Sequence, residues 1–289
     1  MIIRFDPVLL KVRTPLHHGG DEKTGSEVAL RRLKYLVDDR VIEVPYIDGN
    51  ALRGYTRRLL MKDLLDQVGY TLRSVKLYHT LFSGGLLEEV REGGTLNLEL
   101  RRTIRRLLPP VSLYGCSMLN QVFTGKLIVG KCLPVCSELR EYIPIGRIMA
   151  HSERFREIAP ARIKQSFYEY LDWCFATRRA EEEAREKRKP GEQPVQMIYR
   201  YEVFIPGTLL YTWFHLVDAN PVEQSCFSRM IELFKEQPFI GGRSAIGCGE
   251  VELEIDLKNL SPKLYMKFLE EHRGEIAKLL MKLEEMLGS

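Results

Sequence analysis

Arginines gather in three short stretches of this chain, each beside glycines or at an expected helix start. The stretches are Arg31 with Arg32, Arg53 with Arg57 and Arg58, and Arg101 with Arg102, Arg105 and Arg106. A guanidinium group forms charge-assisted hydrogen bonds to phosphate oxygens, so such clusters are typical of contacts to a nucleic-acid backbone. For any one cluster taken alone, a solvated helix face is the better explanation.

A glycine-rich run in the last third of the chain offers a second place for a phosphate or a sugar. Residues 241–249 read GGRSAIGCG. Glycine has no Cβ, so the main chain at Gly241 and Gly242 can come close to a ligand while Arg243 supplies a positive charge. A tight helix-to-strand connection would use the same residues, and both interpretations stay open. We expect this loop to lie beside residues 48–57.

Residues 17–26 (HHGGDEKTGS) hold three glycines and no apolar side chain, which predicts an exposed loop. Its acids Asp21 and Glu22, with Glu27 just beyond, could serve metal-assisted or general-base cleavage of RNA. An acid in a solvated loop is more often only a solubilising charge.

Other chemistries lack their motifs. The chain has no G-x-S-x-G nucleophile elbow and no G-x-x-x-x-G-K-[ST] phosphate loop. Cys132 and Cys136 could join His17 and His18 at a metal only with a second paired ligand group, and none is present. We therefore predict no metal ligand and no cofactor, and we expect these cysteines to be core or near-surface thiols.

Composition excludes several protein classes. The 289 residues are 45% hydrophobic and 28% charged, which is enough for one large domain or two ordinary ones and excludes disorder as a description of the whole. No run of 18 apolar residues and no leader is visible, and six scattered cysteines are expected to be reduced thiols. We expect a cytoplasmic protein without a membrane partner. The net charge of +4 is too small to establish a nucleic-acid partner by itself.

The hydrophobic pattern predicts an α+β fold. Strands are expected at 3–13, 41–47, 126–135, 201–217 (with a break at Pro206-Gly207) and 250–257. Helices are expected at 51–68, 161–189, 221–235 and 262–287. The order resembles the ferredoxin-like βαββαβ pattern with insertions. In the first of these helices, Arg53 and Arg57 lie four apart on one face close to the N-terminus, where free N–H groups attract anions, and we expect both side chains to be exposed.

Several motifs together resemble one family. Residues 44–54 (VPYIDGNALRG) are similar to the helix-start signature of the repeat-associated mysterious protein (RAMP) superfamily. Residues 111–115 with 124–129, residues 202–208 and the glycine run 241–249 resemble three further elements of that family, in the same order. Within it, the chain most resembles the spine subunit of class 1 CRISPR effector complexes.

The resemblance implies a ferredoxin-like (RRM-like) palm and a role in RNA binding. The palm would comprise 1–69, 111–136 and 201–257, with a helical insertion at 70–110, an insertion including the thumb at 137–200 and a C-terminal helix at 258–289. Copies would stack into a helical filament along guide RNA (crRNA) in an antiviral ribonucleoprotein, with other CRISPR effector subunits and the target nucleic acid as partners. The implied RNA-binding residues are His17, His18, Arg31, Arg32, Asn50, Arg53, Arg57, Gly241, Gly242 and Arg243.

The resemblance leaves three functional interpretations. The run 15–25 (PLHHGGDEKTG), with Gly49-Asn50 in place of the family's usual Gly-Ser, looks like the non-cleaving spine of type IV systems, which we favour. A type III-like spine would instead cleave target RNA with a loop acid, here Glu27 or Asp21. A guide-processing endoribonuclease of the same superfamily would need His17 or His18 as its catalytic histidine and usually has two ferredoxin-like units, which disfavours it.

Overall fold

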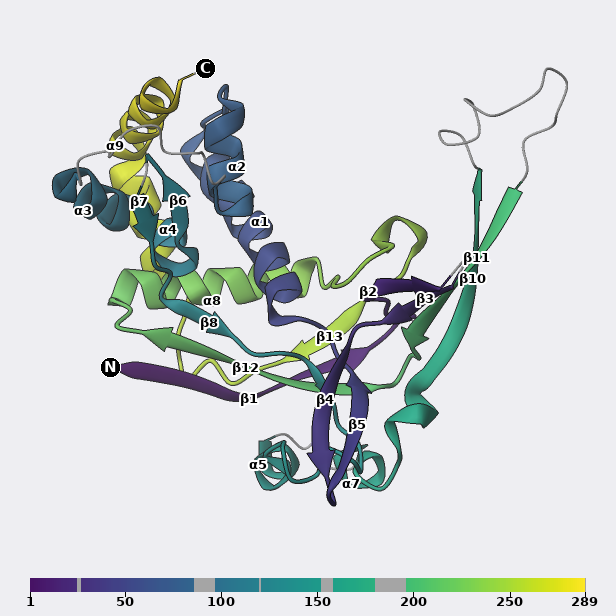
Figure 1. Ribbon diagram of the computed structural model, residues 1–289. Coiled ribbons are helices and arrows are strands. Elements are labelled where there is room, and N and C mark those ends of the chain that lie inside the picture. The colour runs from purple at the N-terminus through teal and green to yellow at the C-terminus, as the bar shows by residue number, and fades with distance from the viewer. Residues whose placement is uncertain (25–26, 86–96, 120, 152–157, 180–195, 289) are drawn as a thin grey trace, which may run out of the picture.

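The computed structural model describes residues 1–24, 27–85, 97–119, 121–151, 158–179 and 196–288. Its centre is an antiparallel sheet in the order β13-β1-β12-β8, with β9 also paired to β12 (Figure 1). These strands are β1 (Ile2–Val12), β8 (Leu127–Val129), β9 (Leu133–Pro134), β12 (Leu209–Val217) and β13 (Val251–Glu254). The predicted strands at 3–13, 126–135, 201–217 and 250–257 are confirmed within these bounds, the last of them shorter than expected.

Two helices cover one face of this sheet. They are α1 (Gly49–Val68) and α8 (Pro221–Glu236), and Figure 1 shows α8 running along the strands. Asp48 caps α1 by accepting the N–H of Asn50, and α8 begins with a capping box between Asn220 and Glu223. The face is apolar, as the stacked rings of Phe5 and Phe227 show.

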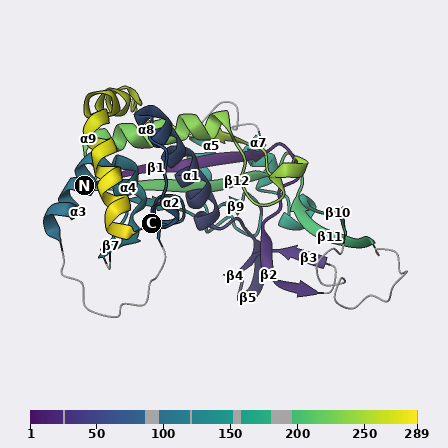
Figure 2. The same cartoon turned by 90° about the horizontal axis from the view of Figure 1, so that it is seen from above.

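Further helices gather on the same side, at one end of the molecule. They are α2 (Val75–Ser83), α3 (Leu98–Leu107), α4 (Pro109–Tyr114) and the long α9 (Lys263–Leu287). Figure 2 shows α9 crossing the end of α8. The predicted helices at 51–68, 221–235 and 262–287 and the helical parts of the insertion at 70–110 are thus confirmed. No helix within the described ranges has both the length and the apolar character needed to span a bilayer.

A second sheet projects from the other end in the order β10-β11-β3-β2. Its strands are β2 (Gly19–Thr24), β3 (Glu27–Leu30), β10 (Leu171–Arg179) and β11 (Gln196–Phe204). The helix predicted at 161–189 is therefore wrong, because 171–179 pairs residue by residue with 196–204; residues 180–189 lie outside the described part. Leu171, Trp173 and Phe175 alternate along the chain as a strand requires, while Leu171 and Phe175, four residues apart, also fit one face of a helix. The backbone pairing with β11 selects the strand.

The loop predicted at 17–26 is also wrong in part. Its backbone from Gly19 to Thr24 is a strand paired with β3, and the side chain of His17 is only 6% exposed. Backbone pairing needs no apolar side chains, so the absence of apolar residues did not exclude a strand here.

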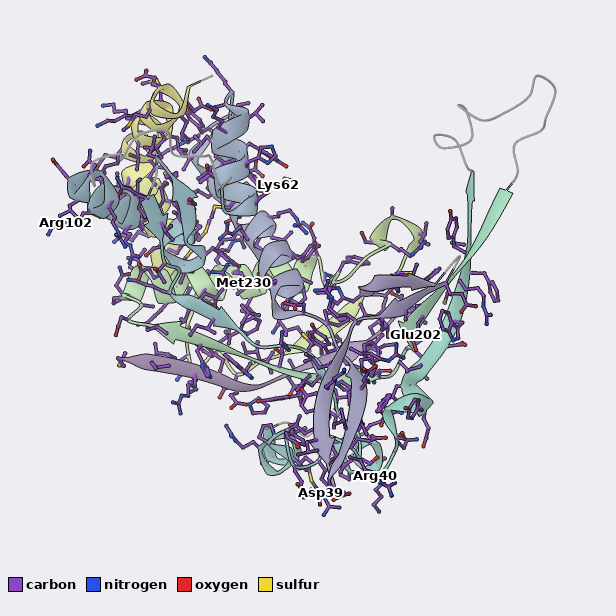
Figure 3. All side chains as sticks on the ribbon, viewed as in Figure 1. Asp39, Arg40, Lys62, Arg102, Glu202 and Met230 are labelled. Atoms are coloured by element: carbon purple, nitrogen blue, oxygen red, sulfur yellow. The ribbon has the colours of Figure 1, made fainter. Side chains whose placement is uncertain are left out.

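A hairpin below the central sheet joins β4 (Arg32–Val37) to β5 (Arg40–Pro45). Asp38 and Asp39 both have positive φ, as a two-residue hairpin turn of this hand requires. Figure 3 labels Asp39 and Arg40 at the tip of the hairpin. The remaining elements are β6 (Cys116–Met118), β7 (Gln121–Phe123), α5 (Ile145–His151), α7 (Ile158–Arg162) and the 3₁₀ turns Phe167–Tyr170 and Ser244–Ile246. The mixed α+β fold class is confirmed.

Candidate nucleic-acid interface

The two α1 arginines are packed into the protein, which corrects the expectation that both are exposed. Arg57 is 5% exposed, and its Nη2 donates to the carbonyl oxygens of Tyr114 (2.8 Å) and Gly115 (2.7 Å). Arg53, half-buried, donates to the same Tyr114 oxygen. These carbonyls end α4, where a helix has unsatisfied acceptors and the negative end of its dipole. Gly84 makes room, since a Cβ there would lie 2.6 Å from Arg57 Nη1.

These arginines keep their charge without an acidic neighbour. Among the described residues no carboxylate forms an ion pair with Arg53 or Arg57. The two guanidinium groups instead lie 5.5 and 5.3 Å from the centre of the Tyr114 ring. Burial and the adjacent Arg53 charge lower the pKa of Arg57 from its ordinary value. Two neighbouring positive charges without a carboxylate partner favour a bound anion.

These residues line a cleft of about 580 Å³, which we call the arginine cleft: Asn50, Arg53, Arg57, Arg58, Gly84 and Tyr114 form most of its polar wall. Arg58 is exposed, so its guanidinium group is available to a ligand. The cleft begins at the N-terminus of α1, where Gly49 lies directly against β8; a Cβ on Gly49 would be 2.7 Å from the Val129 oxygen. Its size and charge suit a phosphate with its adjoining sugar.

On the other side of the start of α1, Asp48 gathers two cations. Its carboxylate lies 3.4 Å from Lys131 Nζ and 3.9 Å from Arg31 Nη1. Burial opposes its ionisation, but the hydrogen bond from the Asn50 N–H and the charge of Lys131 hold the pKa of Asp48 below its ordinary value. Arg31 therefore has a structural partner as well as a place near the helix start.

His17 joins the glycine run to the second sheet. Its Nδ1 donates to the carbonyl oxygen of Glu202 (2.7 Å), and its own carbonyl accepts the Gly242 N–H (2.8 Å). Burial lowers the pKa of His17 below its ordinary value, which keeps the imidazole neutral. The guanidinium group of Arg243 lies 4.1 Å above the ring of Tyr201. Gly241, Gly242 and Arg243 thus form one wall with His17.

We expected the glycine run to lie beside residues 48–57. Its hydrogen bonds to the chain before α1 go instead to the carbonyl oxygens of Pro15 and His17. A hydrogen bond to α1 comes from just before the run, where Tyr55 Oη donates to the Gln237 carbonyl oxygen (3.0 Å). The structure therefore brings the sequence-predicted residues together in two groups, one at α1 and one at His17.

Glu202 fixes the base of the second sheet, where Figure 3 labels it. It is 5% exposed, accepts the Leu30 N–H (2.8 Å) and pairs with Arg32 Nη2 (2.6 Å). Arg32, predicted to bind RNA, is thus used to hold this sheet. The carbonyl of His18, the other predicted histidine, accepts the Arg31 N–H (3.0 Å).

The acids considered for catalysis are not gathered at one place. Glu27, on β3, pairs with Arg200 on the neighbouring strand β11 (2.8 Å). Asp21 lies on β2, and its side chain is outside the described part. In the described residues no three His, Cys, Asp or Glu side chains come together as metal ligands. Burial raises the pKa of Cys132 and Cys136 to about 12, so both thiols are unreactive at neutral pH.

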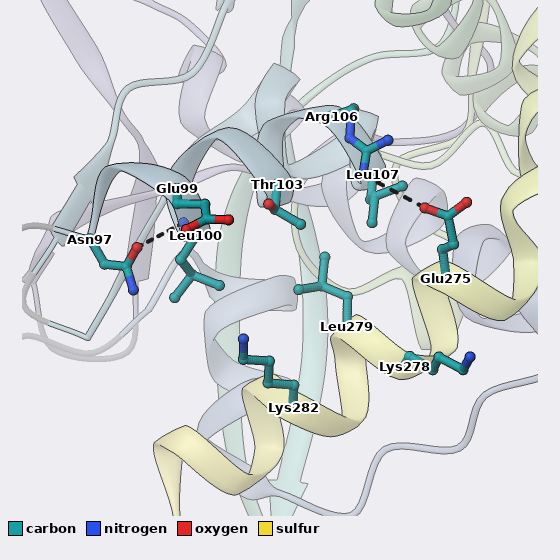
Figure 4. Close-up of a pocket in the computed structure, with 10 residues that line it drawn as sticks. All are labelled: Asn97, Glu99, Leu100, Thr103, Arg106, Leu107, Glu275, Lys278, Leu279 and Lys282. Carbon is teal, nitrogen blue, oxygen red and sulfur yellow. Dashed lines mark hydrogen bonds and ion pairs between the residues drawn. The ribbon is translucent and has the colours of Figure 1, made fainter.

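A separate groove lies between α3 and α9 (Figure 4). Leu100, Leu107 and Leu279 form its floor, and Arg106 pairs with Glu275 across one end (3.6 Å). Its rim carries both signs of charge, with Glu99 and Glu275 as well as Arg106, Lys278 and Lys282, so the acids offset most of the positive charge there.

Sequence reasoning missed Tyr114, Tyr201 and Lys131. The sequence contained a signal only for Tyr114, within the motif at 111–115, since the other two acquire their roles through contacts with distant residues.

No protein-family model matches the chain, and no curated protein matches it. Among solved structures, a chain described as "Type IV-B CRISPR Complex" is similar, with a TM-score of 0.61 and 22% sequence identity. The likeness covers 89% of this chain and 92% of that chain. At this identity the likeness shows that the two chains share a fold.

Proposed function

We propose that this chain is a backbone subunit that binds guide RNA in a CRISPR ribonucleoprotein and does not itself cut RNA. The observation that carries the proposal is the arginine cleft, in which Arg53 and Arg57 lie side by side without a carboxylate partner among the described residues. The fold shared with a chain of a type IV-B CRISPR complex supports it.

The topology of the central sheet supports a ferredoxin-like palm. Taken in chain order, β1, α1, β8 with β9, β12, α8 and β13 follow the βαββαβ pattern, and the strand order β13-β1-β12-β8 places the first and third strands at the centre. The palm would then comprise 1–69, 111–136 and 201–257. The projecting strands β10 and β11 suit the thumb: they begin within the insertion at 137–200, and β11 ends at Phe204, four residues past its expected boundary.

Binding would be independent of RNA sequence. The charged groups of the arginine cleft are the guanidinium groups of Arg53, Arg57 and Arg58, whose contacts to phosphate carry no base information. A uniform surface of this kind suits copies of the chain repeated along one guide RNA in the cytoplasm, beside other effector subunits. RNA cleavage by Glu27, the second candidate function, has less support because that carboxylate is paired with Arg200.

The test begins with the protein as purified from cells. We expect co-purifying RNA, seen as a raised absorbance ratio at 260 to 280 nm, and regular filaments in electron micrographs. The nucleic-acid-free protein should bind unrelated single-stranded RNAs with similar affinity and a strong dependence on salt. A protein that stays monomeric on RNA, or binds only one hairpin, would overturn the proposal.

A further inference from the structure

A second cleft, of about 450 Å³, opens on the opposite side of the start of α1. Four aromatic residues line it: Tyr35 from β4, Tyr142 from the segment before α5, and Tyr211 and Trp213 from β12. Lys131 and Asn50 complete its polar side. We call it the aromatic cleft. Asn50 lines both this cleft and the arginine cleft, so the two meet at the N-terminus of α1.

Two of the three tyrosine hydroxyls of this cleft have partners in the protein. Tyr142 Oη donates to the Leu36 carbonyl oxygen, and Tyr211 Oη donates to the carboxylate of Asp6 (2.9 Å). Tyr142 is nevertheless 46% exposed, and its ring meets that of Tyr35 edge to face with centroids 5.1 Å apart. Ring packing therefore supports Tyr142 in addition to its hydroxyl, and what the cleft offers a ligand is mainly aromatic surface.

Packing against neighbouring residues also holds the side chain of Trp213 in place. Its indole stacks on the ring of His215 with centroids 4.2 Å apart, and it packs against Gly130, where a Cβ would lie 2.7 Å from Nε1. An aromatic ring that is half-buried and already supported loses little conformational entropy when a planar ligand stacks on it.

The charge of the cleft favours an anionic ligand. Lys131 is 44% exposed and Asn50 is exposed at the first turn of α1, where main-chain N–H groups and the helix dipole add positive potential. The one acid on the wall, Asp48, is engaged by Lys131, by Arg31 and by the N–H of Asn50.

We infer that the aromatic cleft binds one unpaired nucleobase of the RNA, with the attached phosphate directed to Lys131 and Asn50. The inference rests on the proposed function and deepens it, because the strand would cross the start of α1 with phosphates in one cleft and a base in the other. Stacking of a base on an aromatic side chain contributes roughly 5- to 150-fold to affinity and tolerates any sequence.

The test uses the tryptophan of the cleft as its own reporter. The chain has two tryptophans, so Trp173→Phe leaves Trp213 as the only one. We would titrate this variant with a short single-stranded oligoadenylate and with an abasic oligonucleotide that has the same number of phosphates. We expect the oligoadenylate to quench the Trp213 emission and to bind several-fold more tightly, and the abasic strand to bind without quenching.

Substitutions at Tyr142 distinguish a loss of base stacking from a loss of folding. Tyr142→Ala in the same background should lose most of the preference for oligoadenylate over the abasic strand, and Tyr142→Phe should keep it, because the ring and not the hydroxyl faces the ligand. Tyr168→Ala removes a tyrosine that is 70% exposed elsewhere and should change neither affinity. Thermal unfolding of each variant checks that the fold is intact.

The outcomes distinguish this inference from the proposed function. Equal binding of both strands without quenching would overturn the inference and leave the arginine cleft as the RNA site. Equal loss of both affinities in Tyr142→Ala would also overturn it, since a merely structural tyrosine affects both ligands alike. Binding of neither strand by the wild-type protein would refute the proposed function and the inference together.

Discussion

Arg53 and Arg57 donate to one acceptor, the carbonyl oxygen of Tyr114. Two guanidinium groups are thereby drawn together at the end of α4, against their mutual repulsion and within the same cleft. The carbonyl dipoles offset part of that repulsion, and an anion bound in the cleft would offset more. The same side chains thus contribute to the fold and to the proposed RNA surface.

Replacing Arg57 should reduce stability as well as RNA binding. Arg57→Ala removes hydrogen bonds from two carbonyls at a buried position, which typically costs about 1–3 kcal/mol in the free energy of unfolding. Arg58→Ala, at an exposed position on the same cleft, should leave stability unchanged and lower the salt dependence of RNA binding by about 0.7 in log–log slope. Urea unfolding and salt titrations measure both. Full stability of Arg57→Ala would contradict the packed role described for it.

At the start of the glycine run, a position that requires glycine stands beside one that does not. Gly241 has a φ of +80°, and a Cβ there would lie 2.3 Å from the His17 oxygen, so Gly241→Ala should lower the free energy of unfolding by about 1–3 kcal/mol. Gly242→Ala serves as its matched control, because the nearest atoms to a Cβ there are 3.9 Å away. Similar melting temperatures for the two variants would contradict this prediction, because they would show that the backbone at position 241 can shift to accept a Cβ.

His17 should make stability depend on pH. Burial lowers its pKa from 6.5 in the folded protein, so the unfolded chain binds the proton more readily. The contribution is fully present above pH 6.5 and is lost as the pH falls below it. His17→Asn retains an N–H donor for the Glu202 carbonyl without titrating. Melting temperatures of the two proteins should therefore converge as the solution is acidified from pH 7 to about 5, and a constant difference would argue against a neutral buried imidazole. The charges of Glu202 and Arg243 also act on the pKa of this ring, in opposite directions, and both are present in each protein.

We expect no guide-directed cleavage of RNA. The Glu27 carboxylate is paired with Arg200, and Asp21 lies six residues earlier on the neighbouring strand. We would incubate the RNA-loaded protein with labelled complementary RNA and magnesium or manganese. The complementary RNA should stay intact, and so should a non-complementary RNA used as the control. Regularly spaced fragments that vanish in Glu27→Ala or Asp21→Ala would establish the cleaving alternative.

The long periodic elements were determined by the sequence itself. β1 nearly alternates apolar and polar residues, and α8 and α9 each carry an apolar stripe at helical spacing. Local start signals, Asp48 before α1 and Pro221 in α8, mark where two of the helices begin, so neighbouring residues were enough to predict them. The order of these elements was enough to predict an α+β fold.

Elements whose partners lie far along the chain were decided only by the tertiary structure. The segment Leu171–Arg179 fits two periods, and its pairing with Gln196–Phe204 selects the strand. The local sequence predicts a surface position for Arg57, whereas in the fold its guanidinium group donates a hydrogen bond to the carbonyl oxygen of Tyr114, 57 residues away. The aromatic cleft joins β4, β12 and the start of α1, which share no local pattern. The local sequence could not predict these features because they depend on hydrogen bonds and packing between residues far apart in the chain, which no short window of sequence contains.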